Sequence, residues 1–99
     1  MEIKTWHVEL FVYEDEEGTT ARAVLHSPAP QHVNGHGRTV KAPADAQVPE
    51  IGDEVAVARA LHDLADNLLT IAADDIAAIE HHPVRLDLAG PSRVVTHGR

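Results

Sequence analysis

The chain has 99 residues, of which 43% are hydrophobic, and its 16 acidic and 8 basic side chains leave a net charge of −8. A chain of this length builds one modest core, and the absence of cysteine excludes disulfides, thiolate zinc sites and a cysteine nucleophile. It shows no basic-then-apolar leader and no apolar run of membrane-spanning length, so we expect a cytoplasmic protein. The negative charge repels phosphate, which disfavours nucleic acid as a partner, although solubility alone also explains such a charge.

Two alternating segments at the start of the chain predict a β-hairpin. Residues 4–13 have the period of a half-buried strand, and their even positions form an apolar side of Trp6, Val8, Leu10 and Val12. Residues 19–26 alternate as well, and their apolar side consists of Ala21, Ala23 and Leu25. The acidic run from Glu14 to Glu17, followed by Gly18, is typical of the turn between them.

The register of this hairpin follows from the requirement that both apolar sides face one core. An even residue of the first strand must then lie opposite an odd residue of the second. The turn length favours four pairs, which are His7 with His26, Glu9 with Val24, Phe11 with Arg22, and Val12 with Ala21. A slip by two residues preserves the same parity and stays open. The third pair permits a cation–π stack, or ordinary sheet stabilisation.

A weaker third strand is predicted from His32 to Lys41. Gly35 and Gly37 interrupt its side chains, which indicates a bulge or a close approach of another backbone. Gly35-His36-Gly37 is a poor candidate for a phosphate loop, because no helix begins directly after it. The prolines in residues 42–49 exclude a central strand there and predict a connector.

One long amphipathic helix is predicted from about Gly52 to Glu80, with acids in its first turn. Its apolar arc, plotted at about 100° per residue, consists of Val57, Ala58, Leu61, Leu64, Ala65, Leu68, Ile71, Ala72, Ile76 and Ile79. Asp75 lies inside this arc. It is either a solvated helix edge or half of an ion pair with Arg22 or Arg38, within the chain or across a dimer.

The predicted fold class is α+β, a three-stranded antiparallel β-meander with one long C-terminal helix packed on one face, in the order β-β-β-α. Residues 1–86 form a single domain and residues 87–99 a flexible tail. The second face of the sheet has no cover in this arrangement, so it meets either solvent or a partner. The candidate partner or dimer interface consists of Phe11, Tyr13, Arg22, Val24 and Asp75.

Several segments resemble a known family. The run from Val48 to Glu54, followed by Ala58-Arg59-Ala60-Leu61, is its most specific part, and the resemblance extends from about Lys4 to Leu86. This family consists of small uncharacterised actinobacterial proteins of unknown function that are labelled double-stranded-RNA-binding-domain-like. The resemblance implies a β-β-β-α fold, mycobacterial relatives tied to dormancy and low oxygen, and a likeness to ribosome hibernation factors that act as dimers. It assigns no catalytic residue.

The residues argue against the RNA-binding activity that this label implies. Double-stranded-RNA-binding domains place lysines at the start of their last helix, where they contact phosphates. Here the same position carries Glu50, Asp53 and Glu54, and the turn between the first two strands is acidic as well. The fold can therefore be shared while the activity is absent.

The chain has eight histidines, which is a high number. His7 and His26 lie side by side in the predicted register, and His36 could lie near them. Such a group could bind a divalent metal or respond to pH, but no HxH or HxxxH spacing supports a metal site, so no metal or other cofactor is expected.

These observations leave three functional hypotheses. The first is a non-enzymatic interaction module, a homodimer that acts in stress or dormancy and contacts a protein partner or the ribosome. The second is a binder of structured RNA, which the acidic charge disfavours. The third is a metal- or small-ligand-binding protein that uses histidines.

Overall fold

The structure is a computed structural model, and it describes residues 1–28, 32–40, 49–86, 88 and 95–96. The chain forms two compact units, residues 1–64 and residues 65–99. No helix in the described part of the chain is long and apolar enough to cross a membrane.

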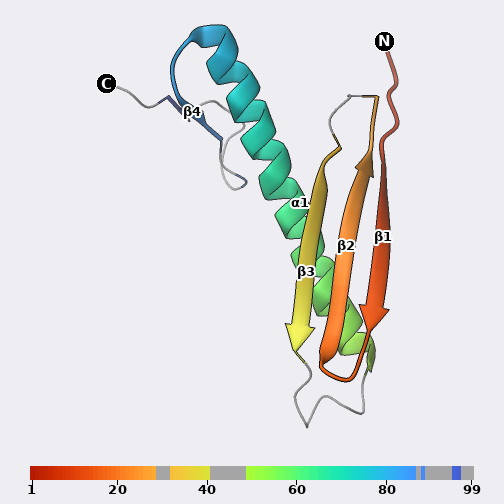
Figure 1. The fold of residues 1–99 in the computed structure, drawn as a ribbon. Coiled ribbons are helices and arrows are strands. Elements are labelled where there is room, and N and C mark those ends of the chain that lie inside the picture. Colours follow the sequence, from red (N-terminus) through yellow and green to blue (C-terminus); the bar gives the residue numbers. More distant parts are fainter. Residues whose placement is uncertain (29–31, 41–48, 87, 89–94, 97–99) are drawn as a thin grey trace. The chain divides into compact units, whose positions relative to one another are not determined.

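The first unit contains a three-stranded antiparallel sheet in the order β1-β2-β3 (Figure 1). Its strands are β1 (His7–Glu14), β2 (Gly18–His26) and β3 (Asn34–Val40). Strand β1 begins three residues later than predicted, because β2 ends at His26 and the residues before His7 have no partner on it. The predicted β-meander followed by one long helix is confirmed.

The predicted register of the β1–β2 hairpin is confirmed at every pair. His7 lies opposite His26 and Phe11 opposite Arg22, so the alternative slip by two residues is wrong. The Asp15 carboxylate accepts hydrogen bonds from the backbone N–H groups of Glu17 and Gly18, which closes the acidic turn. A short polar side chain that bonds the backbone two or three residues on is a common way to stabilise such a turn.

Strand β3 contains the two glycines because the helix lies directly against it. Its pairing with β2 is continuous from Asn34 to Val40, so the bulge interpretation is wrong. A Cβ atom at Gly35 would collide with the backbone of Ala60 and Leu64, and one at Gly37 with the backbone of Ala56 and Ala60. The alternative prediction, a close backbone approach, is the correct one.

Helix α1 (Pro49–Glu80) begins three residues before the predicted start. Proline fits the first position of a helix, where its missing N–H would have no partner, and Glu50 in the first turn suits the positive end of the helix dipole. The helix ends at His81, which has a left-handed backbone with φ of 64° and whose N–H donates to the Ala77 carbonyl oxygen. Pro83 then prevents any continuation.

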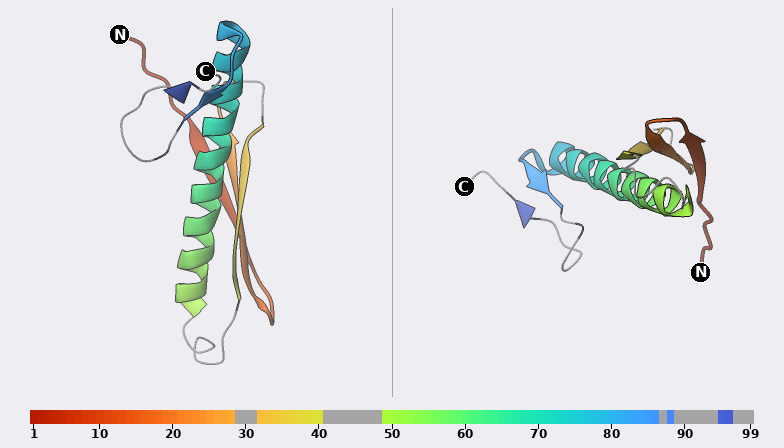
Figure 2. Two further views of the ribbon diagram at one scale, coloured as in Figure 1. Left: turned by 90° about the vertical axis from the view of Figure 1, so that its left-hand side faces the viewer. Right: turned by 90° about the horizontal axis from the view of Figure 1, so that it is seen from below.

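The helix face that packs on the sheet differs from the predicted apolar arc. Leu64 of the arc is nearly fully buried as predicted, but Leu61 is exposed, and the fully buried residues are Ala56 and Ala60, which the arc did not include. The glycines of β3 bring the helix so close that small side chains occupy most of the contact. Figure 2 shows this first half of α1 along one side of the sheet.

The core is therefore built from small side chains. The buried apolar residues in the described part of the chain are Ala21, Ala23, Leu25, Val33, Ala56, Ala60, Leu64 and Ala73. None of the large side chains described is fully buried. Close backbone packing replaces large-side-chain burial in this sheet–helix unit.

The second unit contains the rest of α1 and a small two-stranded sheet. Strand β4 (Val84–Arg85) pairs antiparallel with β5 (Val95–Thr96). Thus part of the predicted tail, residues 87–99, forms a strand, and most of that segment lies outside the described residues. The predicted connector also lies outside them from residue 42 to residue 48.

Candidate functional site

The two edge strands of the sheet differ in how their free backbone groups are satisfied. Along β3, alternate residues direct their N–H and C=O groups away from β2. The His36 N–H donates to the Asp63 carboxylate at 2.8 Å, and the Arg38 carbonyl oxygen accepts from the Arg59 guanidinium at 2.7 Å. Both helix side chains therefore cap the β3 edge, a role that the sequence analysis did not assign to them.

The β1 edge has no such cap among the described residues. The Asp15 N–H donates to the Gly18 carbonyl oxygen, which makes the odd positions of β1 the ones that bond to β2. Val8, Leu10 and Val12 then direct their backbone groups outward. An edge strand of this kind is a template for pairing with another strand.

The same even positions of β1 form an exposed apolar row. Trp6, Val8, Leu10 and Val12 were predicted to face the core, and the last three, which belong to β1, lie on the helix side of the sheet, opposite Leu25, Ala23 and Ala21. Trp6 precedes the strand. Yet the exposed fractions of these four residues are 50%, 44%, 39% and 42%. The prediction of the side is confirmed, and the expectation of burial is wrong, because the helix lies over β3 and β2 and leaves β1 open.

The helix adds apolar side chains to this row. Asp63 and Arg59 reach the β3 edge from one flank of α1, and at about 100° per residue Val57 and Leu61 lie on the opposite flank, toward β1. Leu61 is 40% exposed. Val8, Leu10 and Val12 thus form an exposed apolar row on an edge strand that has no cap among the described residues. Contiguous apolar surfaces of this kind mark interaction sites more often than isolated exposed residues do.

The other face of the sheet, which the helix does not cover, is polar and aromatic. Register and alternation place Tyr13, Thr20 and Arg38 in one row across the three strands, and Phe11, Arg22 and His36 in the next row. Four of the five predicted interface residues (Phe11, Tyr13, Arg22 and Val24) come together on this open face. Asp75 lies in the second unit, where it is exposed.

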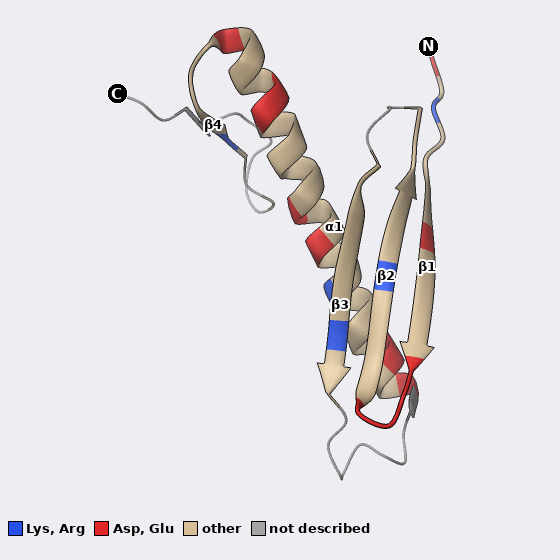
Figure 3. Cartoon of the chain, in the orientation of Figure 1, with Lys and Arg blue, Asp and Glu red and all other residues tan. Residues whose placement is uncertain are grey.

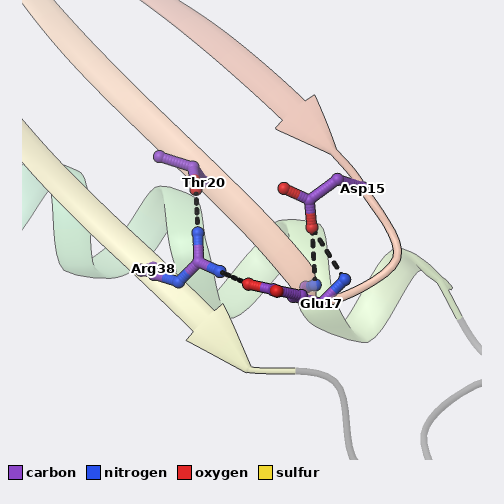
Figure 4. A network of polar contacts seen from close by, with 5 residues as sticks. Asp15, Glu17, Thr20 and Arg38 are labelled. Carbon is purple, nitrogen blue, oxygen red and sulfur yellow. Dashed lines mark hydrogen bonds and ion pairs between the residues drawn. The ribbon is translucent and has the colours of Figure 1, made fainter.

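The two arginines of the open face have definite partners. The Arg22 guanidinium carbon lies 4.9 Å from the centre of the Phe11 ring, so the predicted cation–π stack is present. Arg38 donates to the Thr20 hydroxyl at 2.8 Å and lies 3.5 Å from a Glu17 carboxylate oxygen (Figure 4).

The structure brings together two of the three histidines considered for a metal site. His7 lies opposite His26, and the His26 Nε2 is 3.1 Å from the Glu9 carboxylate. His36 lies opposite Arg22, four residues from His26 along β2, which is about 13 Å. No group of three or more histidine, aspartate or glutamate residues in the described part could hold a metal ion.

Charge is distributed unevenly over the chain. Acidic side chains follow α1 and the β1–β2 turn (Figure 3), whereas Arg22 belongs to β2 and Arg38 to β3. The helix start and the turn are the surfaces that double-stranded-RNA-binding domains use, and both are acidic here. This arrangement opposes contact with an RNA duplex in the manner of that fold.

Comparison with known proteins assigns the family. A family model described as Rv2632c-like matches residues 4–85. The chain belongs to the Rv2632c-like family. The crystal structure of Rv2632c is similar with a TM-score of 0.75 and 41% identity, over 84% of this chain and 98% of that one.

Two mycobacterial relatives show the same level of similarity. The uncharacterized protein Mb1767 of Mycobacterium bovis is 43% identical over 84 residues, which are 85% of this chain and 88% of that protein. The uncharacterized protein Rv2632c of Mycobacterium tuberculosis is 43% identical over 81 residues, or 82% of this chain and 86% of that protein. These names record no activity, so function has to be argued from the surfaces described above.

Proposed function

We propose that this member of the Rv2632c-like family is a non-enzymatic interaction module that works as a homodimer, with the β1 strands of two copies paired edge to edge. The observation that carries the proposal is the exposed apolar row of β1 on the one sheet edge without a helix cap. Pairing would satisfy the outward backbone groups of Val8, Leu10 and Val12 and bury their side chains together.

The register of such a pair follows from symmetry. A two-fold axis perpendicular to the sheet keeps each face on its own side, so an even residue must meet an even residue. Centring the pair on Leu10 places Leu10 opposite the same residue of the second copy and Val8 opposite Val12. Centring it on Glu9 would bring two carboxylates together, which is unfavourable.

The dimer is tested by substituting one residue on each edge. Leu10→Lys places two positive charges at the centre of the proposed pair, whereas Val40→Lys is the matched change at an exposed position of β3. We expect wild type and Val40→Lys to be dimers by light scattering and sedimentation, and Leu10→Lys to be a folded monomer. A monomeric wild type at high concentration would contradict the proposal.

A third variant separates this interface from the open face. Val24→Lys changes the face that the sequence alone indicated as the interface. If Val24→Lys dissociates the dimer and Leu10→Lys does not, then the two copies meet through Phe11, Tyr13 and Arg22 instead of β1.

The resemblance to dormancy-associated proteins and hibernation factors supports a cellular setting for this module, which we propose to be the cytoplasm of stressed cells, with the ribosome as a partner. Purified protein should co-sediment with ribosomes at low salt, and Leu10→Lys should lose this association if the dimer is the binding form. Failure of the wild-type protein to co-sediment would remove the ribosome from the proposal and leave the dimer standing.

A further inference from the structure

We propose that the open face of the sheet binds single-stranded nucleic acid, through an aromatic–arginine face that consists of Phe11, Tyr13, Arg22, His36 and Arg38. This face exists on each copy of the chain and does not depend on the dimer. It lies on the side of the sheet away from the acidic helix start, and the acidic β1–β2 turn borders it where Glu17 lies beside Arg38.

The first support is the placement of the aromatic side chains. The chain has three aromatic residues, and two of them, Phe11 and Tyr13, lie on this face of β1. Tyr13 is 56% exposed, so its ring is open to a base. Bases stack on such rings with little regard to sequence, because every base presents a π-face. Sheets that bind single-stranded RNA use aromatic side chains on an open face in this way.

The second support is the charge. The chain carries a net charge of −8, yet the row of Phe11, Arg22 and His36 on this face carries an arginine and no acidic residue. Arg22 already stacks on Phe11, and the outer side of its guanidinium plane can stack on a base in turn. Each row across the sheet thus combines one aromatic ring with one arginine, so that stacking and phosphate contact lie side by side.

Single-stranded nucleic acid fits this face better than the other anionic polymers. A duplex hides its base faces, so Tyr13 would have nothing to stack on. An acidic peptide satisfies the arginines but leaves the aromatic rings without a planar partner. The contacts that hold Arg38 to Thr20 and Glu17 also keep its guanidinium close to the sheet.

The test is fluorescence anisotropy of a labelled oligouridine with the purified full chain at roughly 50 mM salt, where phosphate contacts are strong. Wild type should bind, and binding should weaken with salt at about 0.7 logarithmic units per phosphate contact. Tyr13→Ala should weaken binding by roughly five- to a hundredfold through lost stacking. Arg22→Gln should weaken it and reduce the salt slope by about 0.7.

Matched controls separate the face from general charge effects. Arg85→Gln removes the same charge from β4 and should bind like wild type, and circular dichroism should show that every variant is folded. Leu10→Lys should still bind a short oligomer, so a monomer that binds separates this inference from the proposed dimer. The inference is overturned by absence of binding at low salt, by equal losses in Arg85→Gln and Arg22→Gln, or by equally effective competition from polyglutamate or a duplex.

Discussion

Among the described residues, helix side chains bond to the β3 edge of the sheet but not to the β1 edge. On β3, Asp63 and Arg59 bond the outward N–H of His36 and the outward C=O of Arg38. On β1, the corresponding groups lie beside an exposed apolar row of Trp6 and its neighbours. Exposed sheet edges promote uncontrolled association unless they are covered or paired in a defined way. One edge is therefore closed within the chain, and the other, which has no cap among the described residues, is where we propose that a second copy pairs.

This difference follows from where the helix can approach the sheet. The glycines of β3 allow backbone contact with Ala56, Ala60 and Leu64, and this contact draws α1 toward β3. The side chains of one helix flank then reach the β3 edge. On the opposite side, the large residues of β1 are left with about half of their surface in water.

The largest effect is expected from Gly37→Val. Its side chain would push the helix away from β3 and so remove the contact that distinguishes the two edges. Its new side chain would overlap the backbone of Ala56 and Ala60, so either the helix moves or the strand does. Overpacking of this kind should cost about 3 kcal/mol in the free energy of unfolding, measured by urea denaturation. His36→Ala, between the two glycines but on the open face, is the control and should change stability by less than about 0.5 kcal/mol. Equal losses in both variants would show that the close approach is not what the glycine provides.

A smaller effect is expected from Asp63→Ala, which makes the β3 edge resemble the β1 edge. The His36 N–H loses its carboxylate acceptor and bonds to water instead, so the cost should be about 1 kcal/mol. Hydrogen exchange should show the His36 amide protected in the wild type and exposed in the variant.

Asp74→Ala is the control for this change, because it removes an exposed acid from a later turn of the same helix. It should leave both stability and His36 exchange unchanged. A His36 amide that stays protected in Asp63→Ala would mean that another group caps the edge.

The smallest effect is expected from Thr39→Val, which removes one hydrogen bond between β3 and the first turn of the helix. The Thr39 hydroxyl donates to the Gly52 carbonyl oxygen at 3.2 Å, and valine keeps the shape of the side chain. The loss should be about 0.5 to 1 kcal/mol in thermal or urea unfolding. Thr5→Val, before β1, is the control and should not change the free energy of unfolding measurably. A similar loss there would mean that replacing any threonine hydroxyl is costly, and that the hydrogen bond from Thr39 to Gly52 is not the cause.

Much of the sheet was predictable from local patterns. Alternation identified the first two strands, and the parity of the apolar sides with the turn length favoured the register that pairs Phe11 with Arg22. The stack between these two side chains followed from the register. The candidate face was therefore predictable in its composition, because residues that share a face of a sheet repeat every second position.

The closed and open edges were not predictable in the same way. The helical pattern gave most weight to large residues such as Leu61 and Ile79, which are exposed, and overlooked Ala56 and Ala60, which are buried. Alanines four residues apart on the helix, together with glycines two apart on a strand, were the pattern that could have indicated the close contact. It was ambiguous in the sequence, because a bulge also explains paired glycines.

The amino-acid sequence by itself indicated the three strands of the sheet, the long helix, the favoured hairpin register and the side of the sheet on which each residue of the hairpin lies, since these depend on local periodicity and turn length. Only the tertiary structure decided which flank of α1 meets the sheet. That choice depends on how closely two backbones can approach, which is a property of pairs of distant residues. With this flank of α1 against the sheet, Asp63 and Arg59 cap the β3 edge, and the apolar row of β1 stays exposed.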